Sequence, residues 1–248
     1  EILILQRLML GPNIVRLYDC VKEPVTKTPA LIMEYVNNTD YKKLMKVFTL
    51  NDIKYYVYQL LRALDYTHSK GVMHRDIKPQ NICYDVQKRE LRVIDWGLAE
   101  FYHPGKRYSV RVASRYYKGP ELLANLEDYD YSLDMWGVGC VLASFVFQKE
   151  PLFKGSDNND QLIQIVKFFG YQEYLDYVHK YGLKVMSSVT KQCSKQAKRS
   201  FSIFMTDDNK KFTTPEAMDL ISKLLVFDQQ NRLTAKEAMD HPFFEGVH

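Results

Sequence analysis

Hydrophobic positions in the first part of the chain predict a helix followed by a pair of strands. Residues 1–10 have the spacing of a helix. The apolar segments 14–21 and 30–36 flank a polar stretch that contains two prolines, which is typical of two antiparallel strands joined by a turn. We therefore expect a small sheet near the start of the sequence.

The clearest helical pattern begins at Thr49. Thr49 and Asp52 have the spacing of a capping box, in which each side chain bonds the backbone N–H of the other residue. The apolar residues that follow recur at spacings of three and four and form one stripe that ends near Gly71: Ile53, Tyr56, Val57, Leu60, Leu61 and Leu64. This pattern predicts a long helix with one buried face.

The remainder of the chain is predicted to be mainly helical. Short strands are expected at residues 82–84 and 91–94, around a polar turn, and nearly every periodic stretch from Pro120 onward is helical. Two helix starts are marked by Thr214 before Pro215 and by Thr234 with Glu237. We expect an α+β protein with a sheet-bearing part, residues 1–35, and a mainly helical part, residues 36–248.

Composition and apolar stretch length indicate the cellular location to expect for this protein. The chain has 248 residues, of which 46% are hydrophobic, and its longest apolar stretch, residues 135–147, is shorter than the roughly 20 residues of a membrane span. No signal sequence opens it, so we expect neither secretion nor membrane anchoring. Four cysteines lie far apart in stretches expected to be core, which favours the cytoplasm or nucleus: Cys20, Cys83, Cys140 and Cys193.

The stretch HRDIKPQN, residues 74–81, places an Asp, a Lys and an Asn between an apolar helix and an apolar strand. Phosphoryl transfer needs a carboxylate to orient the attacking hydroxyl and take its proton, a cation near the transferred phosphate, and oxygen ligands for Mg²⁺. Asp76, Lys78 and Asn81, with Asp95 further on, supply these groups. For Asp76 and Lys78 alone, a solvated surface ion pair would be the simpler interpretation.

Further motifs have the order and spacing found in protein kinases, and the sequence resembles that family from Glu1 to about Phe244. D-W-G begins at Asp95, fourteen positions after Asn81, G-P-E ends at Glu121, and D-M-W-G-V-G begins at Asp134. The resemblance implies a protein-kinase-like fold in which Asp76 is the catalytic base, Lys78 contacts the transferred phosphate, and Asn81 and Asp95 hold Mg²⁺.

Other residues are expected to support this site. The resemblance implies that Glu121 pairs with Arg232 and that Trp96, a larger ring with an N–H donor in place of the usual Phe, holds the activation segment in its active form. The residues with implied supporting roles are Glu1, His74, Arg75, Trp96, Glu121, Asp134 and Arg232.

Two longer stretches resemble the casein kinase 2 catalytic (alpha) subunit family: DWGLAEFYHPGKRYSVRVASRYYKGPELL and PALIMEYVNNTD. This resemblance implies a constitutively competent Ser/Thr kinase that uses ATP or GTP. It implies a nucleotide pocket formed by Met33, Glu34, Val36, Cys83 and Ile94. Without the family spacing, ordinary core packing would be the simpler interpretation of the four that are not charged.

The activation segment is basic. Residues 101–120 contain five Lys or Arg and no Asp or Glu, which favours substrates with acidic residues beside the acceptor. The resemblance implies that Arg111, Arg115 and Lys118 recognise these acidic residues, although Gln80 stands where relatives often carry a basic His. A regulatory phosphate-binding patch is the alternative, and a nucleic-acid site ranks last because no RNA-binding signature accompanies the strip.

The resemblance also implies a binding partner and shows which nucleotide-binding elements of kinases this sequence does not contain. It implies a dimeric regulatory beta subunit that docks near Val21, Pro24, Val25 and Ile32 and gives a heterotetramer. The Gly-rich loop and strand Lys that grip the nucleotide phosphates in kinases are not in this sequence, so this chain alone is expected to be inactive. A catalytically incompetent kinase-fold scaffold is the alternative function.

Overall fold

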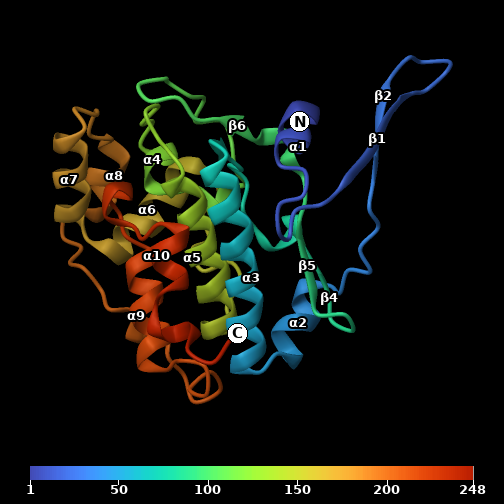
Figure 1. The fold of residues 1–248 in the computed structure, drawn as a ribbon. Helices are drawn as coiled ribbons and strands as arrows, with labels where there is room; N and C mark the ends of the chain where they lie inside the picture. The colour runs from blue at the N-terminus through green and yellow to red at the C-terminus, as the bar shows by residue number, and fades with distance from the viewer. Residues whose placement is uncertain (248) are drawn as a thin grey trace.

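A computed structural model describes residues 1–247 and contains mostly α-helices with a few short strands (Figure 1). Within these residues the strands pair two by two into small antiparallel sheets. The α+β class predicted from the sequence is therefore confirmed, and helices are the main regular structure of residues 41–247.

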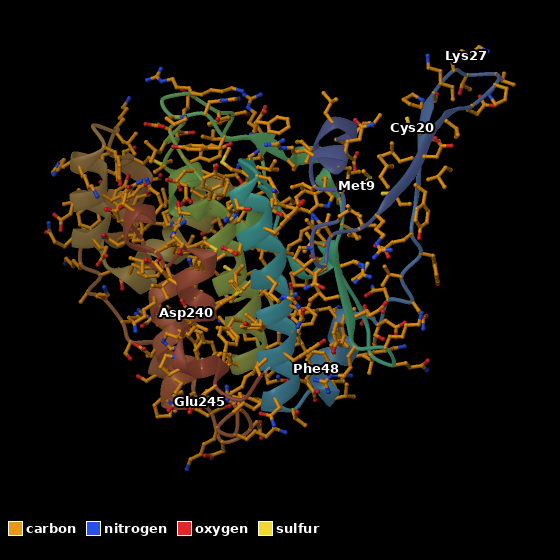
Figure 2. The ribbon with its side chains drawn as sticks, viewed as in Figure 1. Met9, Cys20, Lys27, Phe48, Asp240 and Glu245 are labelled. Atoms are coloured by element: carbon orange, nitrogen blue, oxygen red, sulfur yellow. The ribbon has the colours of Figure 1, made fainter. Side chains whose placement is uncertain are left out.

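The N-terminal part consists of one short helix and a hairpin. Helix α1 covers Ile2–Arg7, so it is shorter than the predicted 1–10, and strands β1 (Leu17–Lys22) and β2 (Pro29–Met33) pair antiparallel as expected. The hairpin extends away from the helical body, with Cys20 and Lys27 along it (Figures 1 and 2). Its side chains are mostly exposed.

The predicted long helix is α3, Leu50–Ser69, which follows the shorter α2, Tyr41–Val47. The capping box is present, because Thr49 Oγ1 accepts from the Asp52 N–H at 3.2 Å and an Asp52 oxygen accepts from the Thr49 N–H at 3.0 Å. All six stripe residues are buried. Helix α3 packs against α5, Ser132–Phe147, an apolar helix in which every residue after Ser132 is buried.

Two small sheets flank the loops that carry the motifs. Strands β4 (Ile82–Asp85) and β5 (Glu90–Val93) form the hairpin predicted from the sequence, within one residue at each end. Strands β3 (Val72–Met73) and β6 (Glu100–Phe101) were not predicted, because two residues are too short to show periodicity. They pair antiparallel and join the start of residues 74–81, which we call the catalytic loop, to the activation segment.

Six further α-helices complete the described part of the chain. They are α4 (Pro120–Leu123), α6 (Asn158–Phe169), α7 (Tyr171–Lys180), α8 (Ser187–Cys193), α9 (Pro215–Leu224) and α10 (Ala235–Met239). Thr214 Oγ1 accepts from the Ala217 N–H at 3.2 Å, and Thr234 with Glu237 forms a second capping box, so both predicted helix starts are confirmed.

The cysteine prediction is correct in part. Cys140 and Cys193 are buried and Cys83 is partly buried, but Cys20 is exposed, because it lies on the hairpin outside the helical core (Figure 2). The expectation that all four are core residues was therefore wrong for Cys20. Of the helices described, none is both long enough and apolar enough to span a bilayer.

Candidate active site

The catalytic loop is anchored to helix α5 by one carboxylate. Asp134, in the first turn of α5, accepts from the backbone N–H of His74 at 2.9 Å and of Arg75 at 2.8 Å, and it contacts His68 Nε2 at 2.9 Å. Burial acts to raise the pKa of Asp134, but these hydrogen bonds and the nearby histidines lower it below its ordinary value. The supporting role expected for Asp134 thus has a defined geometry.

Asp76 is the centre of a small hydrogen-bond network. One carboxylate oxygen, Oδ2, accepts from Lys78 Nζ at 2.7 Å and from Asn81 Nδ2 at 3.0 Å. The other, Oδ1, accepts from the backbone N–H of Ser114 at 2.8 Å and from its hydroxyl at 3.1 Å. The structure therefore brings together three of the predicted residues and fixes the direction of the carboxylate.

Ser114 is a site residue that the sequence reasoning missed. Its Oγ accepts from Lys78 Nζ at 2.7 Å while it donates to Asp76, so it connects the activation segment to Asp76 and Lys78 of the catalytic loop. No spacing in the sequence marks this serine among the other hydroxyl residues of the segment. Its contact forms only when residues 38 positions apart fold together.

Asn81 and Asp95 fit a divalent cation by the chemistry of their oxygens. The Asn81 amide nitrogen donates to the backbone oxygen of Asp76 at 2.9 Å and to its carboxylate, which leaves the amide oxygen as an acceptor. Asp95 is exposed and has a left-handed backbone, with φ of 60°. Residues 1–247 hold no cluster of three or more His, Cys, Asp or Glu suited to a metal. Mg²⁺, which keeps few protein ligands and prefers oxygen, matches this pair.

Trp96 is fixed beneath the D-W-G turn. It is fully buried, its Nε1 donates to the Val93 backbone oxygen at 3.1 Å, and its ring meets the edge of the His74 ring at a centroid distance of 4.7 Å. His74 is buried too, with Nε2 3.0 Å from the Ile94 oxygen and Nδ1 accepting from the Asp76 N–H at 3.1 Å. Both residues connect the D-W-G turn to the catalytic loop.

Arg75 contacts the activation segment, as expected. Its Nε donates to the Leu98 backbone oxygen at 2.6 Å, and its Nη1 donates to the Tyr129 hydroxyl at 3.1 Å. The Tyr129 hydroxyl in turn donates to the Ser109 backbone oxygen at 2.7 Å. Glu1 lies near the D-W-G turn, with its Oε2 3.8 Å from the position that a Cβ on Gly97 would occupy.

The ion pair expected between Glu121 and Arg232 is present and has no exposed surface. Two nearly equal hydrogen bonds of 2.7 and 2.8 Å join the carboxylate to Nη1 and Nη2. Arg232 also donates to the backbone oxygens of Val226 and Ser132. The pair thereby joins the end of the activation segment to the loop before α10.

The residues expected to contact the nucleotide lie at the junction of the hairpin and the helical body. Met33 is 40% exposed, Val36 and Cys83 are partly buried, and Ile94 is partly buried against the hydrophobic core, so ordinary core packing still accounts for Ile94. The carboxylate of Glu34 is engaged, because its Oε1 accepts from Arg92 Nε and from the Arg16 N–H, both at 2.9 Å.

The three basic residues expected to bind acidic substrate side chains, Arg111, Arg115 and Lys118, have different surroundings. Arg111 is exposed, and Arg115 Nη1 donates to the backbone oxygen of Ser156. Lys118 is buried, and its Nζ donates to the Val112 backbone oxygen at 2.6 Å. Burial lowers the pKa of Lys118, although the charge of Asp76 opposes this. The structure therefore does not place the Lys118 ammonium on the surface with the two arginines.

Comparison with known families agrees with this geometry. The family model described as the protein kinase domain matches residues 1–244. The chain belongs to the protein kinase family. Protein kinase domains transfer phosphoryl groups and generally use ATP and Mg²⁺.

Proposed function

We propose that this protein kinase transfers the γ-phosphoryl group of ATP or GTP to Ser or Thr residues that are followed by acidic residues, as casein kinase 2 does. The observation that carries the proposal is the Asp76 carboxylate, held by Lys78, Asn81 and Ser114, next to an activation segment that has exposed arginine and no carboxylate over residues 101–120.

The catalytic step follows from these positions. The acceptor hydroxyl oxygen forms a bond to the γ-phosphorus, the bond from that phosphorus to the bridging oxygen of the nucleotide breaks, and the hydroxyl proton passes to Asp76. Lys78 places positive charge beside the transferred group, within 2.7 Å of the Asp76 carboxylate. Asn81 and Asp95 would hold Mg²⁺, which neutralises phosphate charge when bound.

We also propose that the kinase is active without phosphorylation of its activation segment. Arg75 donates hydrogen bonds to the Leu98 backbone oxygen and the Tyr129 hydroxyl, and the Ser114 hydroxyl donates to Asp76. None of these contacts requires a phosphorylated residue. The buried Trp96, hydrogen-bonded to Val93, opposes rotation of the D-W-G turn, because rotation would break this bond and expose a large ring.

The preference for acidic residues rests on Arg111 and Arg115. Both belong to a segment without carboxylates, and an acidic side chain after the acceptor would gain charge-assisted hydrogen bonds there. Lys118 contributes through the positions of Val110 and Val112, whose backbone oxygens it binds, and the geometry supports this positioning role better than direct contact.

We further propose the partners and location that the resemblance implies. The exposed Val21, Val25 and Ile32 on the β1–β2 hairpin are an apolar surface for a regulatory beta subunit dimer, which would give a heterotetramer. Substrates are acidic proteins rather than nucleic acid or membranes. The absence of disulfides among the described cysteines agrees with a place in the cytoplasm and nucleus.

The experiment that tests the acceptor and the nucleotide uses the full-length protein with Mg²⁺ and three peptides that differ only in carrying Ser, Thr or Tyr before an acidic run. We expect transfer to Ser and Thr from both ATP and GTP. Transfer to Tyr alone, or none from GTP, would contradict the corresponding part of the proposal.

A further inference from the structure

A cavity distant in sequence from the catalytic loop lies between the loop after α5, helix α6 and residues 199–204. Its volume is about 300 Å³, enough for roughly ten water molecules at about 30 Å³ each. Leu152, Phe153 and Phe168 are buried and supply an apolar floor. Phe204 adds a wall, with its ring parallel to Phe168 at a centroid distance of 5.5 Å.

Four cations and no carboxylate line this cavity. They are Lys149, Lys154, Lys167 and Arg199. Across residues 1–247, none of the four has a carboxylate oxygen within 4.0 Å of its charged nitrogens, whereas several other surface lysines and arginines do. The cavity is thus a concentration of uncompensated positive charge above aromatic rings.

Lys149 and Arg199 contact uncharged groups, so their positive charges remain free to bind an anion. Lys149 Nζ lies 4.7 Å from the centroid of the Phe204 ring, and Arg199 Nη2 donates to the neutral Gln196 amide at 3.3 Å. The carboxylate of Asp160 lies near Lys167, but its oxygens already accept from Ser156 and Gln164. Burial lowers the pKa of Lys149, as expected for an ammonium without an anion beside it.

We propose that this cavity binds a phosphate monoester attached to a small apolar or aromatic group, with the phosphate among the four cations and the carbon group on the phenylalanine floor. A phosphate ligand offers several strong acceptor oxygens and close to two negative charges. It therefore neutralises a site of four cations better than a ligand with a single carboxylate would. The apolar floor favours a carrier with a ring over inorganic phosphate.

The site is separate from the proposed catalytic function. None of the lining residues belongs to the Asp76 network, although Lys154 stands two positions before Ser156, whose backbone oxygen accepts from Arg115. The phosphate could belong to a free metabolite or to a phosphorylated side chain of a bound protein, and both carry the same chemistry.

Direct binding tests the proposal without reference to kinase activity. Isothermal titration would measure Kd for phenyl phosphate, for a phosphotyrosine peptide and for its unphosphorylated form, in the absence of nucleotide. We expect phenyl phosphate to bind, and the Lys154→Ala, Lys167→Ala double variant to weaken it about tenfold or more, as expected for loss of charge-assisted hydrogen bonds. A phosphotyrosine peptide that binds at least as tightly as phenyl phosphate would identify a protein segment as the source, and a peptide that binds more weakly would identify a small molecule.

The matched control is Lys191→Ala with Lys195→Ala, which removes the same charge from exposed positions outside the cavity. We expect it to retain the affinity of the unmodified protein, and both double variants to keep the same melting temperature. The proposal would be overturned if phenyl phosphate fails to bind, if both double variants weaken binding equally, or if Arg111→Ala removes binding while the cavity variant does not.

Discussion

At the scale of single residues, the direction of the Asp76 carboxylate is set by groups from two segments. Lys78 and Asn81 hold one oxygen and Ser114 holds the other, so the side chain cannot rotate without losing hydrogen bonds. A base fixed in this way meets the acceptor hydroxyl in one orientation, which is how positioning lowers the barrier of a bimolecular step.

Replacing Asp76 by Asn tests its role as the base. The amide keeps the size of the side chain but cannot take the hydroxyl proton, so we expect kcat to fall by roughly 10²- to 10⁴-fold, the usual contribution of general-base catalysis. Steady-state kinetics with an acidic peptide would measure this, with circular dichroism and the melting temperature as controls for folding. Turnover like that of the unmodified protein would refute the assignment.

His74 gives a prediction about pH. Burial lowers its pKa below 6.5, against the opposing effect of Asp134, and protonation would remove the acceptor that Nδ1 offers to the Asp76 N–H. Because the unfolded chain binds this proton first, the free energy of unfolding should decrease as pH falls from about 6.5 toward the folded pKa, by at most about 1.4 kcal/mol per pH unit.

Urea unfolding at several pH values between 7.5 and 5 would measure this slope. The variant His74→Gln should lose this part of the pH dependence, and His179→Gln, at an exposed position, should keep it. Equal slopes for the unmodified protein and His74→Gln would show that the His74 proton is not linked to folding.

At the scale of elements, local signals were predicted well and long-range contacts were not. The capping boxes at Thr49 and Thr234 depend on residues three positions apart, so the sequence alone defines them. Strands β3 and β6 are distant in sequence and pair only because the tertiary fold brings them together. The contact of Ser114 with Asp76 also depends on the tertiary fold. Motif spacing predicted Asp76, Lys78 and Asn81 because the catalytic loop is continuous in sequence.

Burial explains the residues whose surroundings differed from expectation. Lys118 is part of a basic stretch, but its ammonium turns inward to the Val112 backbone oxygen, which a charge pattern does not reveal. Cys20 lies in an apolar stretch, yet the hairpin stands apart from the core. In both cases the deciding factor is which side of an element meets the rest of the protein.

The Glu121–Arg232 pair should be important for the packing of elements. Removing one partner leaves a buried charge without compensation, so Arg232→Ala should lower the free energy of unfolding by about 3–5 kcal/mol. Urea denaturation would measure the loss. Lys223→Ala, which breaks an exposed pair with Asp219, should cost less than about 1 kcal/mol. Similar losses for the two variants would contradict this account.

At the scale of the whole molecule, the basic activation segment should make substrate binding depend on salt. Exposed charges are screened over about 10 Å at 0.1 M salt, so KM for an acidic peptide should rise as salt is added. The double variant Arg111→Ala, Arg115→Ala should raise KM further and reduce the salt dependence, whereas Lys191→Ala should not. A KM that does not change with salt would count against recognition by this segment.

The measurement that tests the central claim most directly compares two peptides with the full-length protein, one with acidic residues after its Ser and one with Pro at that place. We predict that kcat/KM for the acidic peptide is larger by at least about tenfold, the size of one charge-assisted contact, and that Asp76→Asn lowers transfer to both by at least about a hundredfold. Equal transfer to the two peptides, a preference for the Pro peptide, or no transfer by the folded protein would contradict the proposed function.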